Sequence, residues 1–589
     1  MDDPLSFHNE KQHSPPSRDH GKGAAASLKD EEAEMEIPVV TEHYRRELQT
    51  GEESRDGPQK AVTSEASETS PVYPTGMKLG LITLALCLSV FLVALDNTII
   101  ATAIPRITDE FNSLADVGWY GSAYLLTIAA FQLLFGKFYT FFSIKIIYLV
   151  AIGLFELGSL VCGVAPTSSA LIIGRAIAGV GSAGVFSGAL IIIAHSVPLQ
   201  KRPVYSGFIG SMYGIASVAG PLVGGAFTDH ATWRWCFYIN LPLGAITVGV
   251  IILFFTAPER EAIAETTWKD RVEHLDVLGT IFFMPAVICL LLALQWGGSK
   301  YEWSNARIIV LFVMFALLIS VFVAVQMWKK DNATVPPRIM KNRSIAASSW
   351  FSFCIGSGFF IMLYYLPVWF QAVQGVSAVQ SGIRSLPLVL GMIVLSIISG
   401  VGVSMEGHYT PWMIASSVVM AIGFGLITTL KPDTHSSAWI GYQALGGVGL
   451  GLGIQLPLMA AQTVLDMKDV PTGTSLLIFL QTLGGALFVS IGQNVFTNKL
   501  VQGLAEHAPG INPRIVLSVG ATALQSAIPK EFRAGVTLAY SNALVRAFTV
   551  ATAVAAASFL GAIAVEWKSV KGKKVEKGEK GEEGEKGMA

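Results

Sequence analysis

Charged residues are scarce in this sequence. They make up 14% of its 589 residues, whereas hydrophobic residues make up 52%, and soluble domains carry about 25% charged residues. A chain with so little charge and so much apolar surface is predicted to lie in a membrane. The formal net charge is −1 and no basic face stands out, so we expect no nucleic-acid partner.

Motifs for metal binding, disulfide pairing and phosphate binding are also missing. The five cysteines fall in apolar segments, without a CxxC pair or neighbouring histidines, so we expect free thiols that fill space and no metal site. GxxxxGK[ST], GxSxG, HExxH and EF-hand patterns do not occur, which argues against direct ATP drive and against an enzyme. We expect no cofactor.

Long apolar runs dominate what remains. Crossing about 30 Å of hydrocarbon takes about 20 helical residues, and this length predicts an all-α membrane protein with about fourteen transmembrane helices. The predicted spans are 79–101, 117–136, 145–165, 170–194, 204–226, 236–256, 275–296, 307–328, 345–371, 381–404, 410–431, 438–464, 471–495 and 544–566. Residues 1–77 and 568–589 are polar and of low complexity, so we expect disordered tails.

The distribution of Lys and Arg predicts the orientation. An even number of spans places both tails on one side, and the short connections on that side are richer in Lys and Arg than those on the other. Cytoplasmic loops carry this excess, so both termini are predicted to be cytoplasmic. The plasma membrane is the expected location, and the vacuolar membrane is the alternative.

Three ionisable residues inside the spans are candidates for proton coupling, because each costs about 2.5–3.5 kcal/mol at mid-membrane. Asp96 lies about 7 Å from the end of the first span, and Arg175 lies at a similar depth in the fourth. The two are expected to pair, either as a proton-exchanging site or as a permanent structural ion pair. Glu156, in the third span, is either a second protonatable site or a neutral carboxyl bonded to a neighbouring helix.

The fifth span is unusually rich in helix-weakening residues. Gly220, Gly224 and Gly225 form a small-residue face that allows close helix packing, and Pro221 removes a backbone hydrogen bond. This pattern predicts a conformational hinge, with a static packing kink as the alternative. Trp233 and Trp235, in the loop that follows, are expected to lie at the membrane surface.

Aromatic and amide side chains suggest a substrate cavity. Aromatic residues crowd the ninth span and either line a pocket for a planar solute or face lipid. Buried amides indicate a water-filled cavity or hydrogen bonds between helices. The candidate cavity residues are Asn97, Gln132, Tyr364, Tyr365, Trp369, Gln443 and Gln455.

Several ordered motifs resemble one known family. "LDNTIIATAIPRI" (95–107), "LIIGRAIAGVGSAG" (171–184), "GPLVGG" (220–225), "WRWCFYINLP" (233–242) and "LDVLG" (275–279) are similar to signatures of the major facilitator superfamily. They most resemble its fourteen-helix drug:proton antiporters, in the fungal branch of mycotoxin and multidrug efflux pumps. The resemblance covers nearly all of residues 78–568.

The resemblance implies a specific domain organisation. Two six-helix bundles, at 78–256 and 344–567, would flank two extra helices within 257–343. The second bundle would include a long outer loop at 496–543, and the cytoplasmic tails would be 1–77 and 568–589. The first, fourth, ninth and twelfth spans would line a central cavity and bring Asp96, Arg175, the aromatic span and Gln443 or Gln455 together.

The resemblance also implies the activity. It predicts a proton-coupled exporter of small amphipathic compounds that works by alternating access, as a monomer in the lipid bilayer, with the proton gradient as its energy source. Nutrient or siderophore uptake or exchange is the alternative within transport, and a non-transporting sensor is the alternative outside it. One departure is clear: "GKFYTFFSIK" (136–145) keeps Gly136 and Lys145 but has Thr140 and Phe141 where the family has Asp and Arg, so a charge-based inner gate is not expected there.

Overall fold

The computed structural model describes residues 73–571, apart from 112, 114–115, 258–274, 299, 519–523 and 525–527. The predicted tails therefore lie almost wholly outside the described residues. Within them the chain is nearly all α-helix, and fourteen helices are long and apolar enough to cross a membrane. The predicted all-α membrane fold is confirmed.

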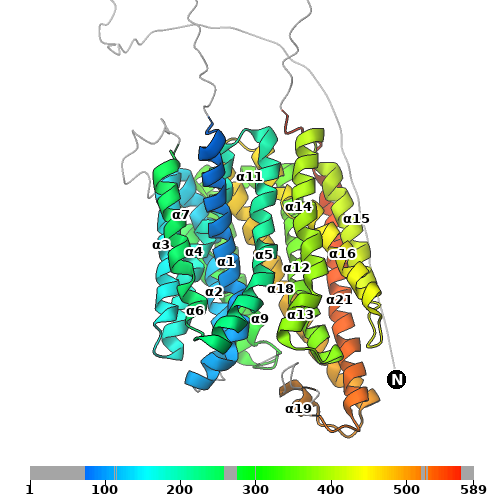
Figure 1. The fold of residues 1–589 in the computed structure, drawn as a ribbon. Helices are drawn as coiled ribbons and strands as arrows, with labels where there is room; N and C mark the ends of the chain where they lie inside the picture. Colours follow the sequence, from blue (N-terminus) through cyan, green and yellow to red (C-terminus); the bar gives the residue numbers. More distant parts are fainter. Residues whose placement is uncertain are drawn as a thin grey trace, which may run out of the picture. The chain divides into compact units, whose positions relative to one another are not determined.

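The N-terminal helices pack against one another (Figure 1, blue to green). The strongest pairings join α3 to α4, α1 to α5 and α2 to α4. Glycines on α4 permit this close approach, since a Cβ at Gly181 would lie 2.3 Å from the Phe155 backbone nitrogen. The helices are α1 (Gly76–Phe111), α2 (Val117–Phe141), α3 (Ile144–Gly163), α4 (Ser168–Ser196), α5 (Arg202–His230), α6 (Trp235–Tyr238) and α7 (Asn240–Phe254).

The C-terminal helices form a second packed group. In it α12 packs on α18 and α21, while α16 packs on α14 and α15. Its core is a cluster of buried aromatic and aliphatic side chains. The helices are α12 (Arg343–Gln374), α13 (Ala378–Arg384), α14 (Leu386–Glu406), α15 (Thr410–Ile427), α16 (Ser436–Gly453), α17 (Leu456–Val464), α18 (Val470–His507), α19 (Pro513–Ser518) and α21 (Arg533–Ala564).

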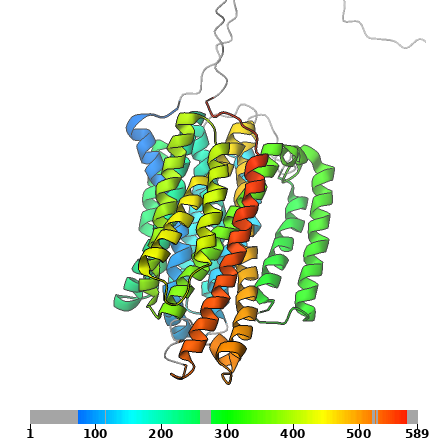
Figure 2. The ribbon, with the colours of Figure 1, turned by 90° about the vertical axis from the view of Figure 1, so that its right-hand side faces the viewer.

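Two further long helices connect the groups. Helices α9 (Val277–Trp296) and α10 (Ala306–Lys329) form a hairpin, and the short α11 (Pro337–Lys341) leads into α12. Helix α9 contacts α2 of the first group and α18 of the second. Figure 2 shows this hairpin, in green at the right, beside α18 in orange.

We call the upper face the end of the helices at which α1 begins and α21 ends, and the lower face the opposite end (Figure 1). Near the upper face the two groups are in direct contact. Helix α5 packs on α14, where a Cβ at Gly400 would lie 2.5 Å from the Pro203 carbonyl oxygen, and α2 packs on α18. Toward the lower face the contact between the groups is looser, since a Cβ at Gly225 would lie 4.0 Å from Val379 Cγ2.

Several helices differ in length from the predicted spans. Helix α1 continues to Phe111, beyond the predicted end at 101, and α6 and α7 divide the sixth span. The predicted outer loop at 496–543 is partly wrong, because α18 extends to His507 and α21 begins at Arg533. The twelfth span breaks between Gly453 and Leu456 into α16 and α17. Apolar length alone does not show where a helix ends once its sequence becomes polar.

Candidate functional site

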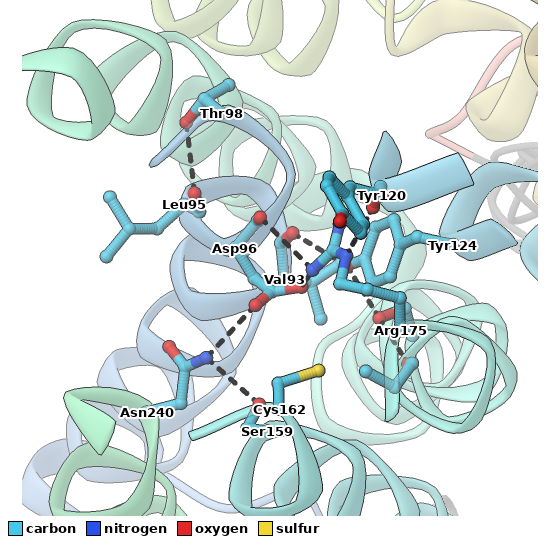
Figure 3. A network of polar contacts seen from close by, with 12 residues as sticks. Val93, Leu95, Asp96, Thr98, Tyr120, Tyr124, Ser159, Cys162, Arg175 and Asn240 are labelled. Atoms are coloured by element: carbon cyan, nitrogen blue, oxygen red, sulfur yellow. Dashed lines mark hydrogen bonds and ion pairs between the residues drawn. The ribbon is translucent and has the colours of Figure 1, made fainter. Parts of the chain in front are cut away.

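Asp96 and Arg175 form a fully buried ion pair between α1 and α4. Arg175 Nη1 bonds to Asp96 Oδ2, and both side chains are 0% exposed. Figure 3 shows the two side chains facing each other between the helices. The pairing expected from their equal depth is therefore present, while its role in proton coupling stays a prediction.

Helix α2 supplies the rest of the guanidinium's surroundings. Arg175 Nε donates to the Tyr120 carbonyl oxygen at 2.8 Å, and the Arg175 guanidinium carbon lies 4.2 Å from the centre of the Tyr124 ring. The Tyr124 hydroxyl donates to the Val93 carbonyl at 2.9 Å, so the ring is fixed to α1. Arg175 Nη2 is buried and has no hydrogen-bond partner in the described part of the chain. The cation is held by the Asp96 carboxylate, by the carbonyl oxygens of Tyr120 and Asp96, and by aromatic faces, chiefly that of the Tyr124 ring.

Asn240 completes the environment of Asp96. Asn240 is fully buried at the start of α7, and its Nδ2 donates to Asp96 Oδ1 at 3.3 Å and to Ser159 Oγ of α3 at 3.0 Å. Figure 3 shows Asn240 on the side of Asp96 opposite Arg175. The site therefore joins side chains from α1, α3, α4 and α7 with the backbone and ring contacts from α2.

Glu156 lies one turn before Ser159 on α3. Its Oε1 lies 1.8 Å from the position that a Cβ at Gly244 of α7 would occupy, so a larger residue there would require the Glu156 carboxyl to move. Both carboxyl oxygens are buried and have no hydrogen-bond partner among the described residues. The alternative that Glu156 is bonded to a neighbouring helix is therefore wrong in this conformation.

The candidate amides of the cavity are mostly buried. Gln132 of α2 and Gln443 of α16 are 1% and 0% exposed, and neither amide makes a hydrogen bond within the described chain. Gln455, at the break between α16 and α17, lies against Gly210 of α5, because a Cβ at Gly210 would lie 2.1 Å from Gln455 Nε2. Asn97 is half-buried on α1. A buried amide without a hydrogen bond lowers the stability of the folded protein. A bound polar ligand would supply the missing hydrogen bonds to these amides.

The three aromatic candidates on α12 differ in exposure. The Trp369 side chain is 0% exposed and donates to Ser541 of α21 at 3.2 Å, and the Tyr365 hydroxyl donates to the Val489 carbonyl of α18 at 2.9 Å. Both side chains fill the space between packed helices, so neither lines a cavity in this conformation. The expectation that Tyr365 and Trp369 line the substrate cavity is therefore corrected. Tyr364 is 55% exposed and stays a candidate.

The Asp96–Arg175 pair and the aromatic residues of α12 were expected to lie together, but the described contacts do not bring them together. Asp96 and Arg175 contact only N-terminal helices, whereas Tyr365 and Trp369 contact α18 and α21. The ion pair is at the centre of one helix group, and the aromatic residues belong to the core of the other.

The glycine-rich part of α5 packs tightly on α1. A Cβ at Gly220 would lie 2.3 Å from Thr98 Oγ1, and one at Gly224 would lie 2.3 Å from Thr102 Oγ1. Gly225 points away from α1, with Val379 as its nearest neighbour. Helix α5 stays continuous through Pro221. These contacts explain the glycines as packing residues, and the hinge stays a prediction.

The upper face is closed without a charge pair at the predicted loop. Gly136 packs against Ser475 of α18, and Thr140 Oγ1 lies 3.3 Å from Thr472 Oγ1. Lys145 Nζ instead donates to the carbonyl oxygens of Ile252 and Phe255 at the end of α7. Hydroxyl and backbone contacts therefore take the place of the family's Asp and Arg.

The linker between the two helix groups takes part in two carboxylate contacts near the upper face. Arg338, just before α12, makes a bidentate contact with Asp469 at 2.6 and 2.7 Å. Asp276 caps α9 with a left-handed backbone (φ +49°) and accepts from Gln326 and Thr334. Burial acts to raise the pKa of the Asp276 carboxyl, but these hydrogen bonds outweigh it and leave that pKa below its usual value. Asp276 is therefore the N-cap of α9.

The lower end of α1 is tied to the turn before α6. Trp233 Nε1 donates to Glu110 Oε2 at 2.6 Å, and Arg234 Nη1 donates to Glu110 Oε1 at 2.8 Å. The Trp233 bond, followed by the Arg234 contact, holds the pKa of Glu110 below its usual value. Trp233 is only 4% exposed and packs inside the protein, whereas Trp235 is 47% exposed. The expected position of the two rings at the membrane surface stays a prediction.

Sequence reasoning missed Asn240, Ser159 and Tyr124 as members of the site. A polar Asn followed by Pro242 within an apolar run is a signal that points to Asn240. Ser159 and Tyr124 give no such signal, because serine and tyrosine are common in membrane helices. Among the described residues, no group of three or more His, Cys, Asp or Glu side chains is placed to hold a metal ion.

Comparison with known proteins identifies the family. A family model described as Major Facilitator Superfamily matches residues 86–489. The chain is 60% identical to "MFS-type efflux pump MFS1" of Trichophyton rubrum over 89% of this chain and 98% of that protein. It is 53% identical to "Efflux pump aflT" of Aspergillus parasiticus over 87% of this chain and 99% of that protein.

A solved structure supports the fold. The human organic anion transporter MFSD10 (TETRAN) matches with a TM-score of 0.51 at 13% identity, over 81% of this chain and 100% of that chain. At this identity the match concerns the fold alone. The family model and the close relatives show that this chain belongs to the Major Facilitator Superfamily.

Proposed function

We propose that this protein is a proton-coupled exporter of small amphipathic organic compounds. It works by alternating access in the plasma membrane, with both termini cytoplasmic. The buried Asp96–Arg175 pair is the observation that carries the proposal. A buried ion pair is costly to maintain and gives little net stability, so a function in transport accounts for it better than a structural role does.

Export is supported by the relatives. Three fungal proteins that share half or more of their residues with this chain over most of its length are named efflux pumps. They come from three genera. Since these names state no cargo, they support the class of activity and not one substrate.

The geometry suggests how a proton would act. With Asp96 ionised, its carboxylate holds Arg175 against α1, and α1 is thereby tied to α4. Protonation of Asp96 removes the negative charge and weakens this contact. Since α1 also packs on α5, and α5 forms part of the contact with α14, a change at Asp96 would reach the contact between the helix groups.

Neutral amides and aromatic rings would receive the substrate. Gln132, Gln443 and Gln455 carry hydrogen-bonding groups without charge, and Tyr364 adds an exposed ring. Such a set favours uncharged, partly planar compounds that carry carbonyl or hydroxyl groups. The upper face, closed in this conformation, would be the cytoplasmic one.

The test uses the full chain in inside-out membrane vesicles, with the neutral planar dye Nile red as the transported probe. An imposed pH gradient, acidic inside, should drive dye accumulation in vesicles containing the wild-type protein. Asp96→Asn should abolish this accumulation. Asp109→Asn, an exposed Asp on the same helix, is the matched control and should retain it.

Three outcomes would contradict the proposal. If wild-type and Asp96→Asn vesicles respond equally to the gradient, Asp96 is not the coupling group. If cells that express the protein accumulate more of the probe than control cells, the protein is an importer. If neither the full chain nor a chain without residues 1–72 and 572–589 transports the probe, and removal of these tails abolishes signalling, the protein is a sensor.

A further inference from the structure

We infer that Glu156 is a second proton-holding carboxyl next to the Asp96 site, and that Asn240 is the positioning residue of the Asp96 carboxylate. This inference rests on the proposed proton coupling. It concerns the interface of α3 and α7, which neither the family match nor the names of the relatives describe.

The first observation is the arrangement of side chains across this interface. Asn240 lies opposite Ser159, and one turn away Gly244 lies opposite Glu156. Residues three or four apart share one face of a helix, so Ser159 and Glu156 face α7 together, as Asn240 and Gly244 face α3. Two polar groups of α3 therefore follow each other along this interface: Ser159, bonded to the Asn240 amide that also bonds to Asp96, and one turn away the unpaired carboxyl of Glu156.

The second observation is the difference in hydrogen bonding between the carboxyls. Asp96 accepts from Arg175 and Asn240, which stabilise a negative charge. Glu156 receives no hydrogen bond on either of its buried oxygens from the described residues. An ionised carboxylate without a donor or a counter-ion is very costly in an apolar environment, so the neutral acid is the form that fits at Glu156 in this conformation.

The third observation is the electrostatic relation between the two groups. Glu156 lies one turn from Ser159, which shares the Asn240 amide with Asp96, and repulsion between two nearby carboxylates opposes ionisation of both. A proton on Glu156 therefore favours the ionised form of Asp96 that pairs with Arg175. The groups that face Asp96 from the surrounding helices are Arg175 (α4), Tyr124 (α2), Glu156 and Cys162 (α3), Cys236 (α6) and Asn240 (α7).

Asn240 has a specific part in this arrangement. Its single amide nitrogen bonds to both Asp96 and Ser159, while its Oδ1 is buried without a partner in the described part of the chain. The amide thereby directs one carboxylate oxygen toward α7 and leaves the other for Arg175. Loss of this donor would favour protonation of Asp96, because the amide stabilises the charged form alone.

The first experiment needs no substrate. Infrared difference spectra of the full chain in lipid vesicles are recorded as a function of pH, and protonated carboxyls are read from their C=O stretching bands. Near neutral pH, we expect the wild type to show a band that Glu156→Gln lacks. Asn240→Ala should move the titration of the Asp96 band, identified by its loss in Asp96→Asn, by about one pH unit to higher pH.

The control variant is Thr247→Ala. Thr247 lies on α7, is fully buried and bonds to the Leu243 carbonyl of its own helix. It should leave both bands at their wild-type positions. Equal melting temperatures of Thr247→Ala and Asn240→Ala would separate a shift of the titration from a loss of folding.

The second experiment measures Nile red transport in two modes. In Glu156→Gln, gradient-driven accumulation of the dye should fall about tenfold, which corresponds to about 1.4 kcal/mol. Substrate counterflow should stay at the wild-type rate, because it needs no net proton movement. A structural role for Glu156 would lower both modes together.

The outcomes distinguish this inference from the proposed function. If Nile red accumulation by the wild type does not depend on the pH gradient, the proposed function is wrong. If the wild type responds while Glu156→Gln keeps every carboxyl band and full gradient-driven transport, the inference alone is wrong. An unshifted Asp96 band in Asn240→Ala would overturn the part that concerns Asn240.

Discussion

The two groups of membrane-crossing helices bury different chemistry. In the N-terminal group, Asp96, Arg175 and Glu156 lie inside the membrane-spanning part. In the C-terminal group, residues 350–383, 386–405, 410–430, 436–465 and 470–498 contain no Asp, Glu, Lys or Arg, and the core consists of aromatic and aliphatic side chains. Under the proposed function the groups would have unequal roles: the first would respond to protons, and the second would supply shape and neutral hydrogen bonds.

Arg175→Ala is expected to have the largest effect, and it tests the N-terminal side of this comparison. The change leaves the Asp96 carboxylate buried without its counter-ion, and we expect a loss of about 3–5 kcal/mol of stability. The measurement is the melting temperature of the purified protein, together with gradient-driven transport. The double variant Asp96→Ala, Arg175→Ala should recover much of the stability and none of the transport; no recovery would mean that the pair is not the source of the loss.

Trp369→Ala tests the other side of the comparison. Removing this fully buried indole from the contact between α12 and α21 should cost about 3–5 kcal/mol. Since Trp369 contacts no ionisable residue of the N-terminal group in the described part of the chain, the pH dependence of the remaining transport should equal that of the wild type. A shifted pH profile would show that the two helix groups are not separate in function.

A smaller effect is expected at the boundary of α1 and α5. Gly220→Ala should cost about 1–3 kcal/mol, because its Cβ would overlap Thr98. Gly225→Ala is the matched control on the same helix, since its Cβ would meet only Val379 at 4.0 Å. Melting temperatures of the two variants are compared; equal values would exclude tight packing as the reason for Gly220.

The smallest effect is expected at Glu110. Its folded pKa is below the usual value, chiefly because of the Trp233 bond, so its stabilising effect is present at neutral pH and is lost as the pH falls below about 4. Because Glu110 is half exposed, Glu110→Gln should cost only about 0.2–1 kcal/mol at neutral pH. The melting temperatures of Glu110→Gln and the wild type should become equal at acidic pH. A difference that does not change with pH would show that the charge of Glu110 is not the source of the stabilisation.

Much of this molecule follows from its sequence, and the reasons differ by region. The fourteen spans follow from apolar length, and the pairing of Asp96 with Arg175 follows from two rare charges at equal depth. The packing role of Gly220 and Gly224 also follows, since small residues allow close helix contact.

Other features depend on contacts that no local pattern encodes. Trp369 and Tyr364 belong to one aromatic run, yet one is buried and the other exposed, because helix rotation against α18 and α21 decides which side is covered. Asn240 belongs to the Asp96 site only because α7 crosses α1 and α3 at that level. The helical extension of α18 to His507 is set by packing against α21.

The α9–α10 hairpin makes the two sides of the molecule mechanically unequal. At its lower end, Gln295 donates to Ser122 and Gly118 of α2, while Trp303 donates to Asn494 of α18. On the opposite side, α5 and α14 meet directly. Any rigid displacement of α2 away from α18 must therefore release the hairpin from one of its two partners, whereas α5 and α14 can separate without such a release.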